Sequence, residues 1–139
     1  MPGYSQLRER EDARIQAWLG ASKKRRTLPD FLRWQFKRLS APQARSAVRL
    51  IFELYTLALL HPREYPGVLE DPLDYWQKLA EQAGVDSKAG AIEATLLLAM
   101  TRGLLLDLCA TGDRARVGRA MNMFARLVEN LTPPVKRQD

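Results

Sequence analysis

The chain has 139 residues, enough for one domain that buries a sizeable core. Apolar residues make up 46% and charged residues 27%, a balance that excludes an intrinsically disordered chain. The single cysteine excludes an internal disulfide and a multi-cysteine metal site, and it fits a cytoplasmic location. No apolar segment follows the first charges, so we expect no secretory signal.

The formal net charge is +6, and much of the excess lies in two short basic runs, at residues 22–26 and 135–139. We interpret both runs as solvated segments. Aromatic residues are not interleaved with them, which argues against a stacking platform for single-stranded nucleic acid. Direct DNA binding by this chain is therefore not expected.

The first two expected helices span residues 4–21 and 27–39. The first is mostly charged, with a few apolar residues at its end, so we expect it to face solvent on most sides. The second begins with Thr27 as N-cap, Pro29 in the first turn and Asp30 at the third position.

A third expected helix spans residues 42–60 and begins with Ser40 and Gln43 in a capping-box pattern. Apolar side chains surround it except for one narrow polar strip, so we expect it at the centre of the domain. A connector with two prolines leads to a fourth helix at residues 71–83, which Gly84 is placed to end.

The last two expected helices span residues 87–112 and 113–131, and residues 132–139 form a flexible tail. The sequence therefore predicts an all-α single domain, residues 1–131, with about six helices and no strands. The longest helix is apolar enough to suggest a membrane span, but Glu93, Arg102 and Asp107 place charges on different sides of it. We therefore expect a packed helix outside the membrane.

Compact side chains line one side of the long helix, and its opposite side is apolar as well. One domain of this size can cover one of these sides, so we expect a second copy to cover the rest in a four-helix interface. A monomer whose third and fourth helices cover everything is the alternative. The expected dimer interface comprises Ile92, Thr95, Ala99, Gly103, Leu106, Ala110, Val117, Met121, Phe124 and Val128.

The order of these features resembles the regulatory domain of the tetracycline-repressor (TetR) family of bacterial transcription factors. "LREREDARIQAWLGAS" resembles the helix that follows the DNA-binding unit, and "DPLDYWQKLAEQAG" resembles a short helix near the effector pocket. "ATLLLAMTRGLLLDLCATGDRARVGRAMNMFARLVENL" resembles the final helix pair. The resemblance implies a homodimer through the last two helices and an apolar or aromatic small-molecule effector bound between the others.

This chain departs from the family at its start, where the family has about three short helices that hold a helix-turn-helix. We therefore expect either a fragment of a complete repressor or a sensor domain without its DNA reader. In the family the effector acts through the connecting helix, here residues 4–21. A helical module that forms heterodimers with an intact regulator is the alternative function.

An effector pocket needs apolar walls and a few polar groups. Several aromatic residues supply walls, and Glu53 and Arg102 supply polar groups, although aromatic residues at helical spacing are often ordinary core. Arg102 has two further interpretations, a salt bridge to a carboxylate such as Glu53 or solvent at a dimer edge. The candidate pocket residues are Trp18, Phe31, Trp34, Phe52, Glu53, Tyr55, Tyr75, Trp76 and Arg102.

Other chemistry-bearing residues have simpler interpretations. We expect His61 to be a solvated turn residue and Cys109 to be a buried, unreactive thiol. No phosphate loop, nucleophile elbow, zinc spacing or paired acid–base constellation is present in the sequence. We therefore expect neither an enzyme nor a cofactor or metal site.

Overall fold

The computed structural model describes residues 2–23, 27–82 and 87–131. Within these ranges it contains six α-helices and one short 3₁₀ turn, and no strand. The predicted all-α class with about six helices is therefore confirmed. The elements are α1 (Pro2–Gly20), α2 (Leu28–Leu39), η1 (Pro42–Ala44), α3 (Arg45–Leu60), α4 (Asp71–Gln82), α5 (Ser87–Thr111) and α6 (Arg114–Leu131).

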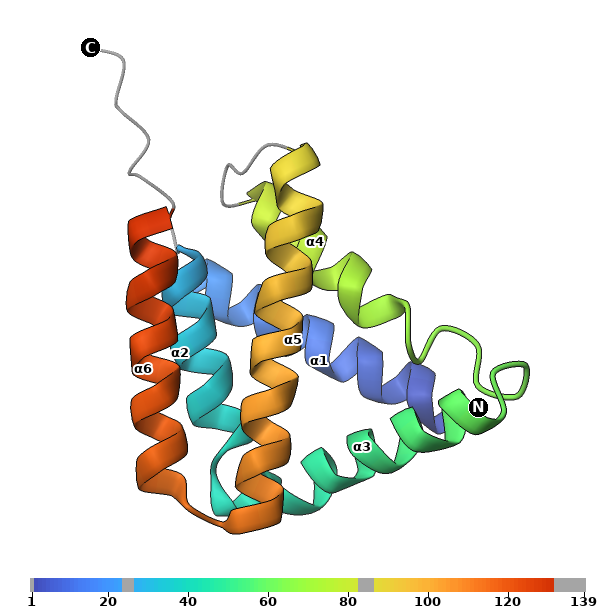
Figure 1. Cartoon of the computed structure of the whole chain (residues 1–139). Helices are drawn as coiled ribbons and strands as arrows, with labels where there is room; N and C mark the ends of the chain where they lie inside the picture. Colours follow the sequence, from blue (N-terminus) through green and yellow to red (C-terminus); the bar gives the residue numbers. More distant parts are fainter. Residues whose placement is uncertain (1, 24–26, 83–86, 132–139) are drawn as a thin grey trace.

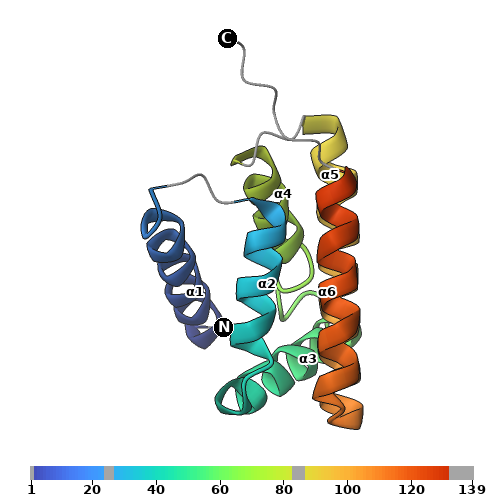
Figure 2. The ribbon, with the colours of Figure 1, turned by 90° about the vertical axis from the view of Figure 1, so that its left-hand side faces the viewer.

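The helices form layers around one core. Helices α5 and α6 run antiparallel and side by side along one side of the molecule (Figure 1). Helix α4 packs against α5, and α2 packs against α6, so these two helices form the middle layer. Helix α1 lies on the far side of α2, and α3 crosses one end of the bundle (Figure 2). The outer surfaces of α5 and α6 therefore have no further helix of the described chain over them.

The start of α2 follows from its sequence. The Thr27 side chain accepts a hydrogen bond from the Asp30 backbone N–H at 3.3 Å, and the Thr27 backbone N–H donates to Asp30 Oδ2 at 3.1 Å. This is a complete capping box, which satisfies two N–H groups that a helix start leaves unpaired. The predicted start signal is confirmed.

The predicted capping box of Ser40 and Gln43 is wrong. The 3₁₀ turn η1 intervenes before α3, and its N-cap is Ala41, which makes no side-chain capping bond. Ser40 instead ends α2, where its backbone N–H donates to the Phe36 carbonyl at 2.8 Å and its Oγ donates to the Lys37 carbonyl at 3.4 Å. Because Pro42 opens a tighter turn, Ser40 lies too far before α3 to cap it.

The main core draws buried apolar side chains from all six helices, with Ile15 of α1 and Val48 of α3 as the single fully buried contributions of those two helices. Helix α2 supplies four residues to it, including Phe31 and Leu32, which are 2% and 1% exposed. The other members include Trp76, Ala94, Leu97, Leu105, Val117, Met121 and Val128.

The prediction that α3 is central is wrong. Val48, Leu54 and Ala58 are its buried residues, whereas Leu59 and Leu60 are 70% and 67% exposed. Since α3 crosses the end of the bundle, it meets neighbours on one side instead of all round (Figure 1). Its second half packs with Val68 of the following connector into a separate small cluster. Leu50, Ile51 and Leu57 are exposed as well.

Helix α1 is mostly exposed, as predicted, and it is anchored by Ile15, which is buried, and by Trp18 and Leu19, which are partly buried. Other predictions lie outside the described residues: the Gly84 cap, the tail at 132–139 and most of the basic run at 22–26.

Candidate functional site

One face of α5 is apolar and open. Ile92, Leu96, Ala99, Gly103 and Leu106 are all exposed, and the exposed fractions of Ile92, Leu96 and Leu106 are 67%, 58% and 53%. Their spacing alternates between four and three residues, which places them on one stripe of the helix, as in the seam of a coiled coil. All six α5 residues of the predicted interface are exposed, namely Ile92, Thr95, Ala99, Gly103, Leu106 and Ala110.

The α6 part of the predicted interface needs correction. Val117, Met121 and Val128 are 0%, 1% and 6% exposed and belong to the core of the same chain. Phe124 is partly buried against that core. These side chains pack inward because α2 lies along this face of α6, so the three buried ones have almost no surface to offer a second chain.

A second apolar row on α6 is exposed instead. It consists of Ala120, Met123 and Leu127, of which Met123 and Leu127 are 60% and 54% exposed. Their spacing of three and four residues again follows one stripe of the helix. This row lies on a different side of α6 from the buried residues.

The two exposed rows lie at matching levels of the helix pair. Asp107 of α5 and Arg116 of α6 are bonded across the turn, which fixes the register of the antiparallel pair. Counting away from this bond, with the same rise per residue in both helices, brings matching positions to the same level. Gly103 is then level with Ala120, Met100 with Met123, and Leu96 with Leu127. We call the exposed apolar residues of these rows the α5–α6 face, made of Ile92, Leu96, Ala99, Met100, Gly103, Leu106, Ala110, Ala120, Met123 and Leu127.

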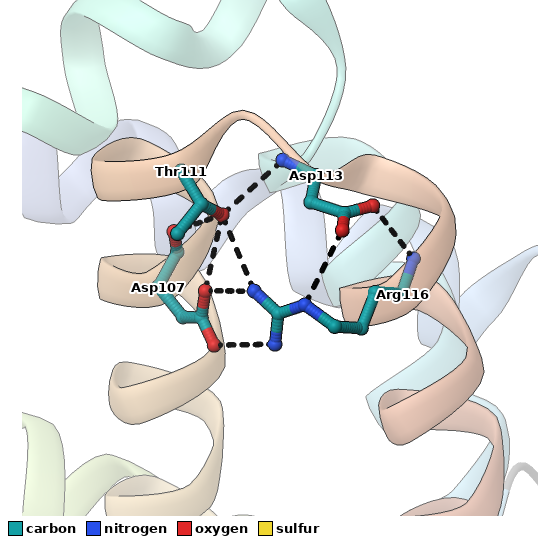
Figure 3. Close-up of polar contacts among 4 residues, drawn as sticks. All are labelled: Asp107, Thr111, Asp113 and Arg116. Carbon is teal, nitrogen blue, oxygen red and sulfur yellow. Dashed lines mark hydrogen bonds and ion pairs between the residues drawn. The ribbon is translucent and has the colours of Figure 1, made fainter.

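A polar cluster ties the two helices together at their shared end, as Figure 3 shows. Arg116 donates from Nη2 to Asp107 Oδ1 at 2.6 Å and from Nη1 to Asp107 Oδ2 at 2.9 Å, so the two residues form a bidentate ion pair. Its Nε donates to Asp113 Oδ2 at 3.3 Å, and Thr111 Oγ1 donates to Asp107 Oδ1 at 3.1 Å. The cluster therefore links the last turn of α5 to the first turn of α6.

The backbone of the turn and the charges of the cluster support the same arrangement. Gly112 has a φ of 68°, a conformation that favours glycine, and its N–H donates to the Leu108 carbonyl at 2.8 Å. Hydrogen bonds from Arg116 lower the pKa of Asp107, and the same bonds raise the pKa of Arg116. Both groups thus remain charged and paired at neutral pH.

The predicted pocket residues fall into separate groups. Trp18, Phe31, Trp34 and Trp76 form an aromatic cluster between α1, α2 and α4, with the Trp18 and Trp34 rings stacked at 4.9 Å between centroids. Phe31 meets Trp76 edge-on at 5.0 Å. The rings fill the space between the helices by contact with one another.

Tyr75 lies near the polar side of this cluster. Its hydroxyl is buried and has no hydrogen-bond partner within the described ranges. Burial raises the pKa of Tyr75, and the nearby charges of Asp12 and Glu11 raise it further. Arg38 pairs with Glu11 and lies over the Trp34 ring at 5.2 Å, which fastens α1 to α2.

Phe52, Tyr55 and Arg102 form a second group, between α3 and α5. The Arg102 Nε donates to Tyr55 Oη at 3.2 Å, and the Phe52 and Tyr55 rings meet edge-on at 6.1 Å. Glu53 is exposed and makes no ion pair with Arg102 in the described part of the chain. The alternative interpretation of Arg102, a salt bridge to Glu53, is therefore wrong.

A hollow of about 50 Å³ lies between the start of α3 and the α5–α6 turn. None of the nine predicted pocket residues lines it; its wall includes Arg45, Val48, Leu105 and Cys109. Cys109 is exposed, so its predicted burial is wrong. His61 is exposed at the end of α3, as predicted for a turn residue.

Sequence reasoning missed the exposed α6 row and the Arg116 cluster. The apolar stripe through Val117 was the stronger signal, and it belongs to the core. A usable signal was nevertheless present, because the positions 96, 100, 103 and 107 mirror 127, 123, 120 and 116 about the bond between Thr111 and Gly112. This symmetry places two matched rows side by side once α5 and α6 are taken as an antiparallel pair.

Two further findings limit the chemistry of the site. No group of three or more His, Cys, Asp or Glu side chains suited to a metal occurs among the described residues. The stretch Ala91–Thr111 of α5 is long and apolar enough to cross a membrane, and 28% of it is buried inside the chain. A single helix of this kind is weak evidence for a membrane protein.

Comparison with known proteins adds no assignment, since no protein-family model, curated protein or solved structure matches this chain.

Proposed function

We propose that the chain is the dimerising, effector-sensing domain of a TetR-like transcriptional repressor, working in the bacterial cytoplasm. The observation that carries this proposal is the α5–α6 face, the set of exposed apolar residues on the outermost helix pair of the bundle. Exposed apolar surfaces of this extent are typical of protein–protein interfaces. DNA contact would be the task of a separate helix-turn-helix unit.

The properties of the face favour a second copy of this chain as its occupant. The chain carries a net charge of +6, so two copies repel each other unless they meet on a neutral surface. The α5–α6 face is apolar by its definition, and at one end of it Asp107 and Arg116 neutralise each other. A twofold axis would place the same rows opposite themselves, as an isologous interface requires.

The small residues of the face set how closely two copies approach. Ala99, Gly103 and Ala110 form a strip of small residues along α5, beside the larger Ile92 and Leu106. Helices that meet at small residues bring their backbones together and exclude water from the larger neighbours. A Cβ added at Gly103 meets no atom within 4 Å in the isolated chain. Its lack of a side chain is therefore unexplained within one chain and is explained by a close partner.

A pair of arginine substitutions tests the dimer. We expect the wild-type chain to sediment as a dimer and Gly103→Arg to sediment as a monomer. The new arginine occupies the space over the strip of small residues and repels the same arginine of the second copy. Gly118→Arg is the matched control. Gly118 also has open space around its Cβ position, but it lies on a different side of α6 from the exposed row of Ala120, Met123 and Leu127. The control should remain a dimer.

Two outcomes would contradict the dimer. A wild-type chain that sediments as a monomer at all concentrations would show that the chain does not self-associate. A Gly103→Arg variant that stays dimeric would show that another surface mediates it. The alternative function, pairing with an intact regulator, uses the same face, and it predicts a monomer that gains mass when such a regulator is added.

The sensing part of the proposal is supported by one group of side chains. Arg102 and Tyr55 offer polar groups between α3 and α5, beside the Phe52 ring. An apolar or aromatic effector is expected to raise the midpoint of thermal unfolding, because binding to the folded state stabilises it. A screen in which no such compound raises the midpoint would count against sensing.

A further inference from the structure

Arg102 is a partly buried cation in the middle of an apolar helix, and no carboxylate pairs with it in the described part of the chain. Its Nε donates to Tyr55 Oη at 3.2 Å, and its Cζ lies 4.5 Å from the centre of the Tyr55 ring. Its Nη2 is buried and has no hydrogen-bond partner among the residues that the structure describes. The guanidinium is therefore held in place while part of its hydrogen-bonding capacity is unused.

Such an arrangement is costly for folding. A buried donor without an acceptor loses its bonds to water and gains nothing in return, and the loss is larger when the donor is charged. An apolar residue at this position would avoid the cost. The contact with Tyr55 fixes the plane of the guanidinium but leaves its positive charge uncompensated. An anion that binds there would supply both the missing acceptor and the missing charge.

The surroundings indicate what kind of anion fits. The Phe52 ring packs edge-on against Tyr55, and Leu98 of α5, which is 8% exposed, lies one helical turn before Arg102. Tyr55 and Arg102 are both partly exposed, so a ligand approaches the exposed side of the guanidinium, and the buried Nη2 has to turn toward it to donate. One guanidinium balances one negative charge, and planar carboxylates match its fork of donors. Aromatic and aliphatic walls suit an apolar body attached to that charge.

We propose that Arg102 binds the carboxylate of a small organic acid with an apolar body, and that Tyr55 is a positioning residue that orients the guanidinium. This inference rests on the proposed sensing function and names the chemical class of its effector. The ligand lies between α3 and α5, with its apolar part against Phe52 and Tyr55.

A titration followed by nitrogen–proton NMR tests the proposal on the whole chain. We expect the Nε–H signal of Arg102, identified by its loss in Arg102→Gln, to shift saturably with benzoate or hexanoate. Benzamide, which has the shape of benzoate without its charge, should leave the signal in place. Because a charge-assisted bond is lost, Arg102→Gln should weaken benzoate binding about tenfold or more.

Two variants separate binding from structure. Tyr55→Phe keeps the ring and removes the hydroxyl, so benzoate binding should weaken by a smaller factor, and the Nε–H signal should exchange faster with water. Arg119→Gln removes an exposed arginine of α6 and should bind benzoate like the wild type. Thermal unfolding of each variant without ligand confirms that it is folded.

Three outcomes would overturn the proposal: equal binding of benzoate and benzamide, unchanged benzoate binding by Arg102→Gln, or an Nε–H shift that follows protein concentration instead of benzoate. The last would place a carboxylate of a second copy on Arg102. Sedimentation of the same samples keeps the two proposals apart. A chain that sediments as a dimer and shows no Nε–H shift with benzoate refutes the acid site alone. A chain that sediments as a monomer and shows the shift refutes the dimer alone.

Discussion

Helix α6 carries two apolar rows on different sides, and only one of them is covered within the chain. Val117, Met121 and Val128 lie in the core, while Met123 and Leu127 are open to solvent. Both rows consist of similar residues at similar spacing. Apolar periodicity therefore identifies a surface that another element has to bury. The neighbouring helices decide whether that element belongs to the same chain.

The sharpest way to test this difference is to truncate one methionine in each row. Met121→Ala should lower the free energy of unfolding by about 2–5 kcal/mol, because it leaves a cavity in the core. Met123→Ala should change it by no more than about 0.5 kcal/mol in the monomer, because that side chain is already 60% exposed. Urea unfolding at protein concentrations below dimer formation measures both. Equal losses would show that the chain covers the exposed row itself.

Two glycines give the next largest contrast, with opposite signs. Gly112→Ala should destabilise the chain by about 1 kcal/mol, because its φ of 68° is strained for any residue with a side chain. Gly103→Ala should stabilise the monomer by up to about 1 kcal/mol, because alanine favours the helix and has open space there. The check is thermal unfolding at low protein concentration. A loss of stability for Gly103→Ala would mean that other atoms of the chain already occupy the space beside Gly103.

The smallest effect concerns the cluster that holds the two helices in register. The pKa of Asp107 is lowered from 3.8 in the folded chain, so its carboxylate stabilises the fold above that pH. The contribution is lost as the pH falls through the lowered value, and it is small because the pair is exposed. Wild-type stability should therefore fall more than that of Asp107→Asn between about pH 6 and about pH 2. If urea unfolding showed the same loss of stability for the wild type and Asp107→Asn over this pH range, the ion pair would not contribute to the stability of the fold.

Local features of this fold could be predicted from the sequence, because they depend on residues close together in the chain. The capping box of Thr27 and Asp30 needs no information from elsewhere, and neither does the break at Gly112. The start of α3 was missed because Pro42 allows both an α-helical and a 3₁₀ beginning. The difference between the two depends on how the chain leaves α2.

Features that depend on long-range packing could not be predicted. The apolar surface of α3 indicated a central helix, but the bundle offers neighbours on one side only, so Leu59 and Leu60 remain exposed. The sequence places Arg102 among the apolar residues of one helix, but its contact with Tyr55 joins residues 47 positions apart and follows from the crossing of α3 and α5. For α6, the sequence indicated an apolar stripe but not which partner covers it.

The short, cross-bonded turn at Gly112 has a mechanical consequence. Because Arg116 bonds to Asp107 of α5 and to Asp113 at the start of α6, the adjoining ends of the two helices are held at one spacing. Sliding one helix along the other would first have to break these exposed bonds, so the two apolar rows that begin at this end keep their relative level.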